Sequence, residues 1–186
     1  TVLLVGSALL ESQEAMALLH GIAEKTGADI LAPTSNRRME RGQGRFAINK
    51  VPYPINAALE CLAPYSRAIL IETPPPVAFF AYPGKPSLLL PVDCHTVTLA
   101  AVDADGSTAL AALADRIGAK PATPRDHERP AAPQAGGITL QNLGAALANA
   151  LPEDAIVVDE AVSSGGATFP AGDSAAPNTW LALTGG

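Results

Sequence analysis

The residues best suited to chemistry follow a short apolar run near the end of the chain. Residues 155–158 are apolar and lead into two acids, Asp159 and Glu160. Two serines and two glycines come next, at positions 163–166. An apolar run of this length, bounded by turn residues, is typical of a buried parallel strand. Ligands of open α/β sheets bind beyond the carboxyl ends of such strands, where small residues let a phosphate approach backbone N–H groups and hydroxyls.

The first 118 residues alternate predicted strands and helices, which is the pattern of a parallel α/β sheet. Strands are predicted at residues 1–5, 28–32, 66–71, 87–90 and 96–102, and helices at 11–25, 55–62 and 108–117 with Ser107 as N-cap. The predicted fold class is α/β, a Rossmann-like parallel sheet with helices on both faces. The turn at residues 6–10 lacks the GxGxxG spacing of a dinucleotide-binding fingerprint.

A proline-rich segment then changes the character of the chain. Residues 119–137 contain four prolines and almost no large apolar side chain, which predicts an interdomain linker. Thr139 is expected to cap a helix over residues 140–151. We therefore expect one domain over 1–118, the linker over 119–137, and a partial second α/β domain over 138–186. The abrupt ends at Thr1 and Gly186 suggest an internal piece of a longer protein.

Four arginines lie in a glycine-containing segment after the second predicted strand. They are Arg37, Arg38, Arg41 and Arg45. Such a loop could hold a phosphate or a nucleotide edge, because guanidinium groups bind these groups with two parallel hydrogen bonds. A solvated loop, or one that pairs with a neighbouring domain, is the favoured interpretation.

Aromatic and histidine side chains offer further candidates. Phe79, Phe80 and Tyr82 could stack on a planar ligand, although packing in a lid or a domain contact is favoured. His95 lies at a strand edge and His127 lies in the linker. His95 has no carboxylate or nucleophile at a recognisable spacing and is expected to be structural, and the place of His127 in the linker argues against a catalytic role.

Composition narrows the classes of partner. The 186 residues are 48% hydrophobic and carry a formal net charge of −6, which argues against a nucleic-acid partner because phosphate binding needs concentrated Lys and Arg. No apolar run approaches the roughly 20 residues that span a bilayer. Cys61 and Cys94 form no CxxC or zinc pattern, and both are expected to be reduced in a cytoplasmic protein.

The order of these elements resembles thiamine-diphosphate-dependent enzymes, in particular acetolactate synthase-like proteins and benzoylformate decarboxylases. The most specific cue is the ordered pair Val-Asp-Glu-x-x-x-Ser at 158–164 and Leu-Thr-Gly-Gly at 183–186. The segment at 77–86 is also similar to a central-domain stretch of benzoylformate decarboxylase-like members. The resemblance implies a six-stranded central domain over 1–118 and the opening of the diphosphate-binding domain over 138–186.

The resemblance also implies a cofactor site. The residues that would contact or lie beside the cofactor are Val162, Ser163, Ser164, Thr184, Gly185 and Gly186. It assigns no catalytic or metal residue to this chain, because the activating Glu belongs to an N-terminal domain and the Gly-Asp-Gly…Asn magnesium motif lies further along. Thiamine diphosphate and Mg2+ are thus expected in the full-length enzyme. FAD is not expected, because residues 71–76 depart from the FAD-binding segment of the family.

The implied parent enzyme decarboxylates a small 2-keto acid and releases an aldehyde or joins it to a second carbonyl compound, with the cofactor carrying the chemistry. This chain would be inactive alone. Its expected partners are the missing N- and C-terminal domains and further copies in a homodimer or homotetramer, with no nucleic acid and no membrane. Two alternatives remain: a non-catalytic nucleotide-binding module that uses the arginine segment, and a structural spacer.

Overall fold

The computed structural model describes residues 1–161 and 165–182 and divides the chain into two compact units. The first unit comprises Thr1–Leu10, Glu14–Ser35 and Ile48–Ala122, and the second comprises Glu11–Gln13, Asn36–Ala47 and Thr123–Gly186. Each unit contains its own sheet. The short segment 36–47 therefore lies between two segments of the first unit in the sequence but belongs to the second unit in the fold.

The sheet of the first unit has five parallel strands in the order β4-β2-β1-β5-β6. Their bounds are β1 (Val2–Val5), β2 (Asp29–Ala32), β4 (Asn49–Lys50), β5 (Arg67–Ile71) and β6 (His95–Ala100). The central strand β1 is buried along its whole length, as its unbroken apolar sequence requires. The predicted α/β class with a parallel sheet is confirmed.

The expectation of six strands in this unit is wrong. Residues 87–90 form no strand, and Leu88 makes only an isolated bridge to Val77. Pro86 and Pro91 flank this apolar run, and proline cannot donate a backbone hydrogen bond to a neighbouring strand. On the other side of β6, residues 101–105 turn directly into the next helix, so no strand follows β6 in the sheet.

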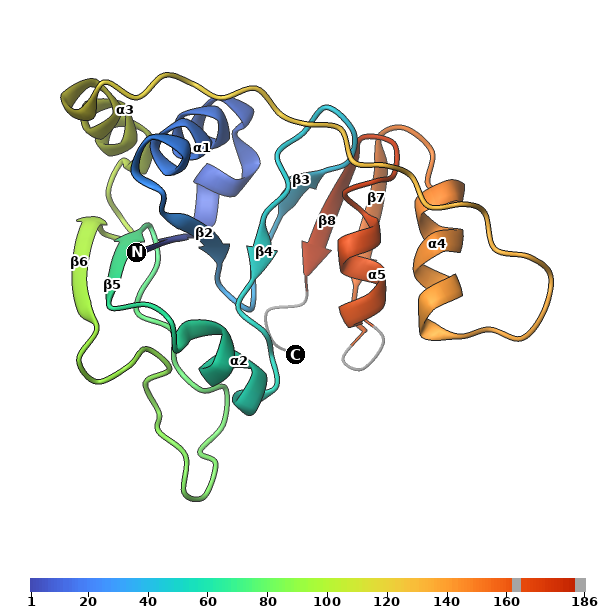
Figure 1. Ribbon diagram of the computed structural model, residues 1–186, viewed down its shortest axis with the longest axis horizontal. Coiled ribbons are helices and arrows are strands. Elements are labelled where there is room, and N and C mark those ends of the chain that lie inside the picture. Colours follow the sequence, from blue (N-terminus) through green and yellow to red (C-terminus); the bar gives the residue numbers. More distant parts are fainter. Residues whose placement is uncertain (162–164, 183–186) are drawn as a thin grey trace. The chain divides into compact units, whose positions relative to one another are not determined.

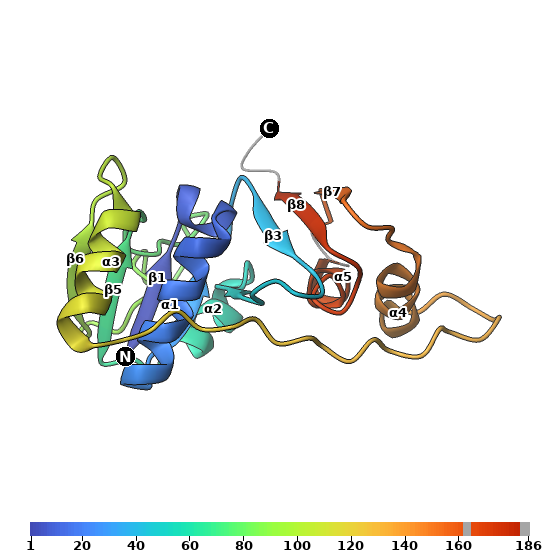
Figure 2. The same cartoon turned by 90° about the horizontal axis from the view of Figure 1, so that it is seen from above.

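Helices cover both faces of this sheet, as predicted (Figures 1 and 2). Helices α1 (Gln13–Thr26) and α3 (Gly106–Ile117) lie on one face, and α2 (Ile55–Leu62) lies on the other. The α2 face forms a continuous apolar core that includes Val2 and Leu4 of β1 together with Leu62 of α2. The N-cap of α3 is Asp105 and not Ser107, because the Asp105 carboxylate accepts a hydrogen bond from Thr108 N at 3.0 Å.

The second unit has a three-stranded sheet in the order β3-β8-β7. Its elements are β3 (Met39–Arg41), α4 (Leu140–Ala150), β7 (Ala155–Asp159), α5 (Gly165–Ala171) and β8 (Asn178–Ala182). Strand β7 runs parallel to β8, and β3 runs antiparallel to β8. Thr139 caps α4 in a reciprocal capping box with Asn142, as the sequence predicted for Thr139.

The proline-rich residues 119–137 contain no helix or strand. Within the first unit, Ala122 N donates to Ala17 O at 2.9 Å. Within the second unit, Asp126 accepts a hydrogen bond from Gly44 N, and Arg129 Nε donates to Ser174 O at 3.3 Å. The segment is therefore extended but anchored along its length. Among the described residues, no helix is both long and apolar enough to cross a membrane.

Candidate functional site

The two segments predicted to bind the cofactor begin at the carboxyl ends of two neighbouring strands of the second sheet. Strands β7 and β8 are adjacent and parallel, and their last residues, Asp159 and Ala182, are partners in the register. Residues 160–164 and 183–186 therefore follow neighbouring carboxyl ends, which is where α/β sheets bind ligands. The six predicted residues, Val162, Ser163, Ser164, Thr184, Gly185 and Gly186, lie outside the described residues.

The last residue of β7 shapes the start of the first segment. Asp159 Oδ1 accepts a hydrogen bond from Ala161 N at 3.0 Å, which is an Asx-type turn closed by the side chain. Helix α5 resumes the described chain at Gly165, which lies beside the same carboxylate. Asp159 thus helps to direct the chain as it leaves the sheet.

Arg41 holds helix α5 in place through its side chain. The sequence predicted only a loop position for this residue. The Arg41 side chain is 1% exposed. Its Nη2 atom lies 2.7 Å from Asp173 Oδ1 and donates to Phe169 O at 3.0 Å. Its guanidinium carbon also lies 3.5 Å from the centre of the Phe169 ring, which is a cation–π contact. Arg41 therefore ties β3 to α5 and to the turn after it.

Burial shifts the pKa of both members of this pair. Burial lowers the pKa of Arg41 to about 10, and the charge of Asp173 opposes that shift. Burial raises the pKa of the Asp173 carboxyl, while Arg41 and His127 pull it down. Each charge thus depends on the other for compensation in the interior of this unit.

The other three arginines of the segment also face acids. Arg37 pairs with Glu11 at 2.6 Å on the surface, and Arg38 and Arg45 both pair with Glu40. The structure therefore does not gather the four guanidinium groups around one shared pocket. The favoured interpretation was a solvated loop or one that pairs with a neighbouring domain. The pairing is confirmed in part, because residues 39–41 form a strand that pairs with β8 within the second unit.

The strand order of the first sheet places its topological switch point between β1 and β5. Glu72, directly after β5, is buried with a φ of 53°, and its Oε1 accepts a hydrogen bond from Gly106 N at 3.0 Å. A Cβ on Gly6 would lie 2.9 Å from Glu72 O. A carboxylate of the chain itself therefore occupies the N-terminus of α3, the end of a helix that favours anions. The sequence predicted Glu72 only as the first residue of the loop after the strand at 66–71.

The aromatic cluster is exposed, and its members contact one another. Phe79 and Phe80 are 55% and 57% exposed, and their ring centres are 4.9 Å apart. Tyr53 and Tyr82 extend the chain of ring contacts at either end. This arrangement presents an aromatic surface and no closed slot for a planar ligand.

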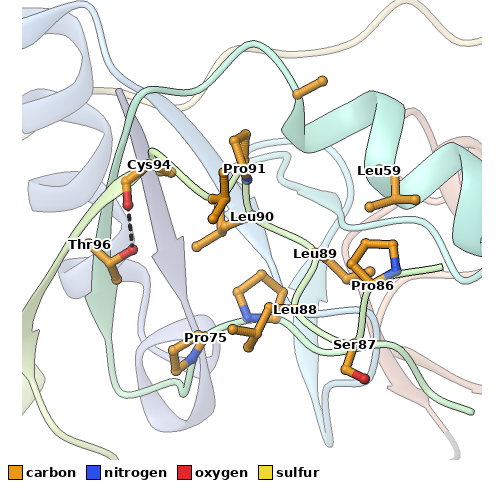
Figure 3. Close-up of a pocket in the computed structure, with 13 residues that line it drawn as sticks. Leu59, Pro75, Pro86, Ser87, Leu88, Leu89, Leu90, Pro91, Cys94 and Thr96 are labelled. Carbon is orange, nitrogen blue, oxygen red and sulfur yellow. Dashed lines mark hydrogen bonds between the residues drawn. The ribbon is translucent and has the colours of Figure 1, made fainter. Parts of the chain in front are cut away.

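An apolar cavity of about 870 Å³ lies nearby, on the α2 side of the first unit (Figure 3). Pro75, Leu88 and Pro91 contribute to its wall, and Thr96 lies at one end. Among the described residues, no charged side chain lines it. The cavity can therefore accept apolar groups, and the Cys94 thiol is the titratable group among its described lining residues.

The remaining candidates are two histidines and two cysteines. His95 is exposed at the start of β6, and His127 lies in the proline-rich segment with its backbone bonded to Gln43. Cys61 and Cys94 are both free thiols. Residues 1–161 and 165–182 contain no group of three or more metal-ligating side chains.

Comparison with known proteins identifies relatives of this chain. No family model matches it. A Mycobacterium tuberculosis protein (strain ATCC 25618 / H37Rv) assigned as an acetolactate synthase large subunit, IlvX, is 37% identical over 167 residues. The match covers 89% of this chain and 32% of that protein.

Two solved structures share the fold. One is assigned as a thiamin diphosphate-dependent enzyme of Mycobacterium smegmatis, with a TM-score of 0.65 and 22% identity over 98% of this chain and 38% of that one. The other is the thiamine diphosphate-dependent 4-hydroxybenzoylformate decarboxylase of Rhodococcus jostii RHA1, with a TM-score of 0.66 and 18% identity over 97% and 37%. The chain spans about a third of the length of these relatives. It is thus related in sequence to an acetolactate synthase large subunit-like protein and has the fold of part of the thiamine diphosphate-dependent enzymes, as the sequence resemblance predicted.

Proposed function

We propose that this chain supplies the central domain and the first part of the diphosphate-binding domain of a thiamine-diphosphate-dependent 2-keto-acid enzyme. The observation that carries the proposal is the pairing of Asp159 with Ala182 at the ends of two parallel strands. Both predicted cofactor segments start from these two adjacent carboxyl ends. The relationship to an acetolactate synthase-like protein supports the same assignment.

In this proposal the chain binds and orients the cofactor but does not react. Val162, Ser163 and Ser164 supply backbone N–H groups and hydroxyls to the diphosphate. Thr184, Gly185 and Gly186 lie beside the cofactor and leave room for its close approach. When bound, thiamine diphosphate supplies the electron sink for decarboxylation of a small 2-keto acid. Mg2+ and the activating Glu are held by parts of the longer protein outside this chain.

Exposed apolar side chains on β7 of the second unit support the proposal that this chain is part of a longer protein. Ile156 and Val158 of β7 are 68% and 60% exposed on one face of the sheet. Two large apolar side chains on a strand stabilise a fold only when another element covers them. We propose that the remaining domains of the same protein provide this cover, and that the boundaries near 118 and 138 separate the central domain, the linker and the diphosphate domain.

The proposal extends to assembly and location. The longer protein forms a homodimer or homotetramer and works in the cytoplasm. The free thiols of Cys61 and Cys94 support a reducing compartment. Cell fractionation that recovers the protein only outside the cytoplasm would contradict this location.

A structural spacer is the second candidate, and it is better supported than a nucleotide-binding module. The arginines of the 36–47 segment pair with acids of the same unit, and the Glu72 carboxylate accepts a hydrogen bond from Gly106 N at the start of α3. Calorimetric titration of the chain with ADP distinguishes the two alternatives. Tight binding that Arg37→Ala weakens would support a nucleotide-binding module.

Turnover of 2-keto acids tests the main proposal. The 186-residue chain should give no product with thiamine diphosphate and Mg2+, while the longer protein that carries it should release CO2 from a 2-keto acid. Equal turnover by the chain alone would contradict the assignment of the reacting groups to other domains. Absence of turnover and of cofactor binding by the longer protein would leave the spacer as the better account.

A further inference from the structure

A second cavity, of about 740 Å³, lies on the face of the first sheet that α1 and α3 cover (Figure 2). Its floor is a row of partners in adjacent strands, Leu3 of β1, Ile69 of β5 and Val97 of β6. Ile22 of α1 and Leu113 of α3 line it from the two helices. The cavity is thus a space between sheet and helices. Its volume and its mostly apolar lining are typical of a small-molecule site.

The polar groups of this cavity lie together at the amino ends of β5 and β6. Arg67 and His95 are partners in the parallel register and also line the cavity, two residues before Ile69 and Val97. Because side chains alternate along a strand, Arg67 and His95 share the face of the apolar row and lie about 7 Å from it. Both are exposed, whereas Ile71, further along the same face of β5, is fully buried. The cavity therefore has an apolar interior and a basic mouth.

The positive charge at this mouth has no acid beside it in the described part of the chain. Among the described residues, no Asp or Glu lines the cavity, and Arg67 takes part in none of the ion pairs. The last turns of α1 and α3 also end here, and Gly27 N and Gly118 N donate to their carbonyls, which leaves Arg67 as the dominant charge. A guanidinium group in this setting favours an anion, above all a carboxylate that accepts two parallel hydrogen bonds.

We propose that this cavity binds an apolar monocarboxylate, with its hydrocarbon chain on the row of Leu3, Ile69 and Val97 and its carboxylate at Arg67. His95 supplies an additional N–H donor at the mouth. An uncharged apolar molecule would leave Arg67 without a partner, and a small anion such as phosphate would leave the apolar floor empty. The site lies wholly within the first unit and does not depend on the cofactor site of the second unit.

Calorimetric titration with octanoate tests the site. The α-amino group of the chain is acetylated for this experiment, because Thr1 also lines the cavity and its free amine would compete with Arg67 for the carboxylate. Octanoate should bind, and octan-1-ol, which has the same chain without the charge, should bind at least tenfold more weakly. Acetate has the charge without the chain and should give no measurable binding.

Three variants locate the two ends of the ligand. Arg67→Gln should weaken octanoate binding at least tenfold and leave the affinity for octan-1-ol unchanged, which separates a lost charge from a lost fold. Arg116→Gln is the matched control, because Arg116 is exposed on α3 and does not line the cavity, and it should bind octanoate as the unmodified chain does. Leu113→Trp fills the apolar part from α3 and should abolish binding of both ligands, with the fold checked by circular dichroism.

Several outcomes would overturn the proposal. The first is no binding of octanoate to the unmodified chain, or equal affinities for octanoate and octan-1-ol. The second is an equal affinity for octanoate in Arg67→Gln and Arg116→Gln, which would remove the carboxylate from Arg67. The third is full octanoate binding by a folded Leu113→Trp chain, which would place the ligand outside this cavity.

Discussion

Arg41 Nη2 lies 2.7 Å from Asp173 Oδ1 in the interior of the second unit, with the Phe169 ring against the same guanidinium. The pair joins β3 to the turn that follows α5. Helix α5 in turn begins directly after the segment proposed to hold the diphosphate. A residue that the sequence places among surface arginines therefore supports the framework of the candidate site.

Replacing Arg41 with Met should destabilise the second unit by about 3–5 kcal/mol, because removing one partner leaves the Asp173 carboxylate, only 14% exposed, without its compensating charge. Urea unfolding followed by Trp180 fluorescence measures this directly, since Trp180 is the single tryptophan and is 3% exposed. Arg38→Met is the matched control. Arg38 pairs with Glu40 from a side chain that is 48% exposed, so its loss should cost less than about 1 kcal/mol. Equal losses of unfolding free energy for the two variants would show that the Arg41–Asp173 pair stabilises the unit no more than the exposed Arg38–Glu40 pair.

Two glycines of the same segment test backbone packing. Gly42 has a φ of 104°, and a Cβ there would lie 2.5 Å from Ala176 O. Gly44 has a φ of 71° with open space around it. Gly44→Ala should therefore cost only the strain of a left-handed residue, about 1–2 kcal/mol, while Gly42→Ala should cost clearly more. If Trp180 fluorescence reports the same urea midpoint for both variants, the close approach of this segment to residue 176 is wrong.

Glu72 tests the switch point of the first unit. Glu72→Leu should lower the free energy of unfolding by about 1–3 kcal/mol, because it leaves the N–H of Gly106 without the acceptor that it has in the structure. Glu72→Gln keeps an acceptor oxygen and the same backbone, so it should retain most of the stability. Circular dichroism during urea unfolding measures both variants. A Gln variant as unstable as the Leu variant would assign the effect to the charge and not to the hydrogen bond.

His20 gives the first unit a predictable response to acid. Burial lowers the pKa of His20 below 6.5, and Glu24 opposes the shift. The unfolded chain therefore takes up this proton first as the pH falls, so the contribution of His20 is present above pH 6.5 and is lost as the pH falls through the folded pKa. His20→Gln should flatten the decline in stability between pH 7 and pH 5. Parallel profiles for the two proteins, from urea midpoints at each pH, would exclude the mechanism.

Local sequence signals predicted several elements of both units. The unbroken apolar run of β1 and the helix at 55–62 in the first unit, and the capping role of Thr139 in the second, all follow from neighbouring residues, and all are present. The strand expected at 87–90 is absent because its flanking prolines withhold backbone donors. Sequence patterns over a few residues therefore predicted the elements that depend on interactions between near neighbours in the chain.

The supports of the candidate site were not predictable in this way. Strand β3 has three residues, which is too few to show an alternating pattern, and its partner β8 is distant in the sequence. Burial of Arg41 depends on Asp173 and Phe169, and no spacing rule connects them to it. Glu72 offered one signal, a lone acid directly after an apolar strand, but its bond to Gly106 depends on the topology of the sheet.

Binding of thiamine diphosphate with Mg2+ to the longer protein that carries this chain tests the central claim most directly. Ser163→Glu introduces a negative charge where the diphosphate is proposed to bind, and it should raise the dissociation constant at least tenfold, or about 1.4 kcal/mol. Ser107→Glu, at an exposed position of α3 in the first unit, should leave the affinity unchanged. A tenfold or greater loss confined to Ser163→Glu is the predicted result. Unchanged affinity in both variants would contradict a cofactor site at the ends of β7 and β8.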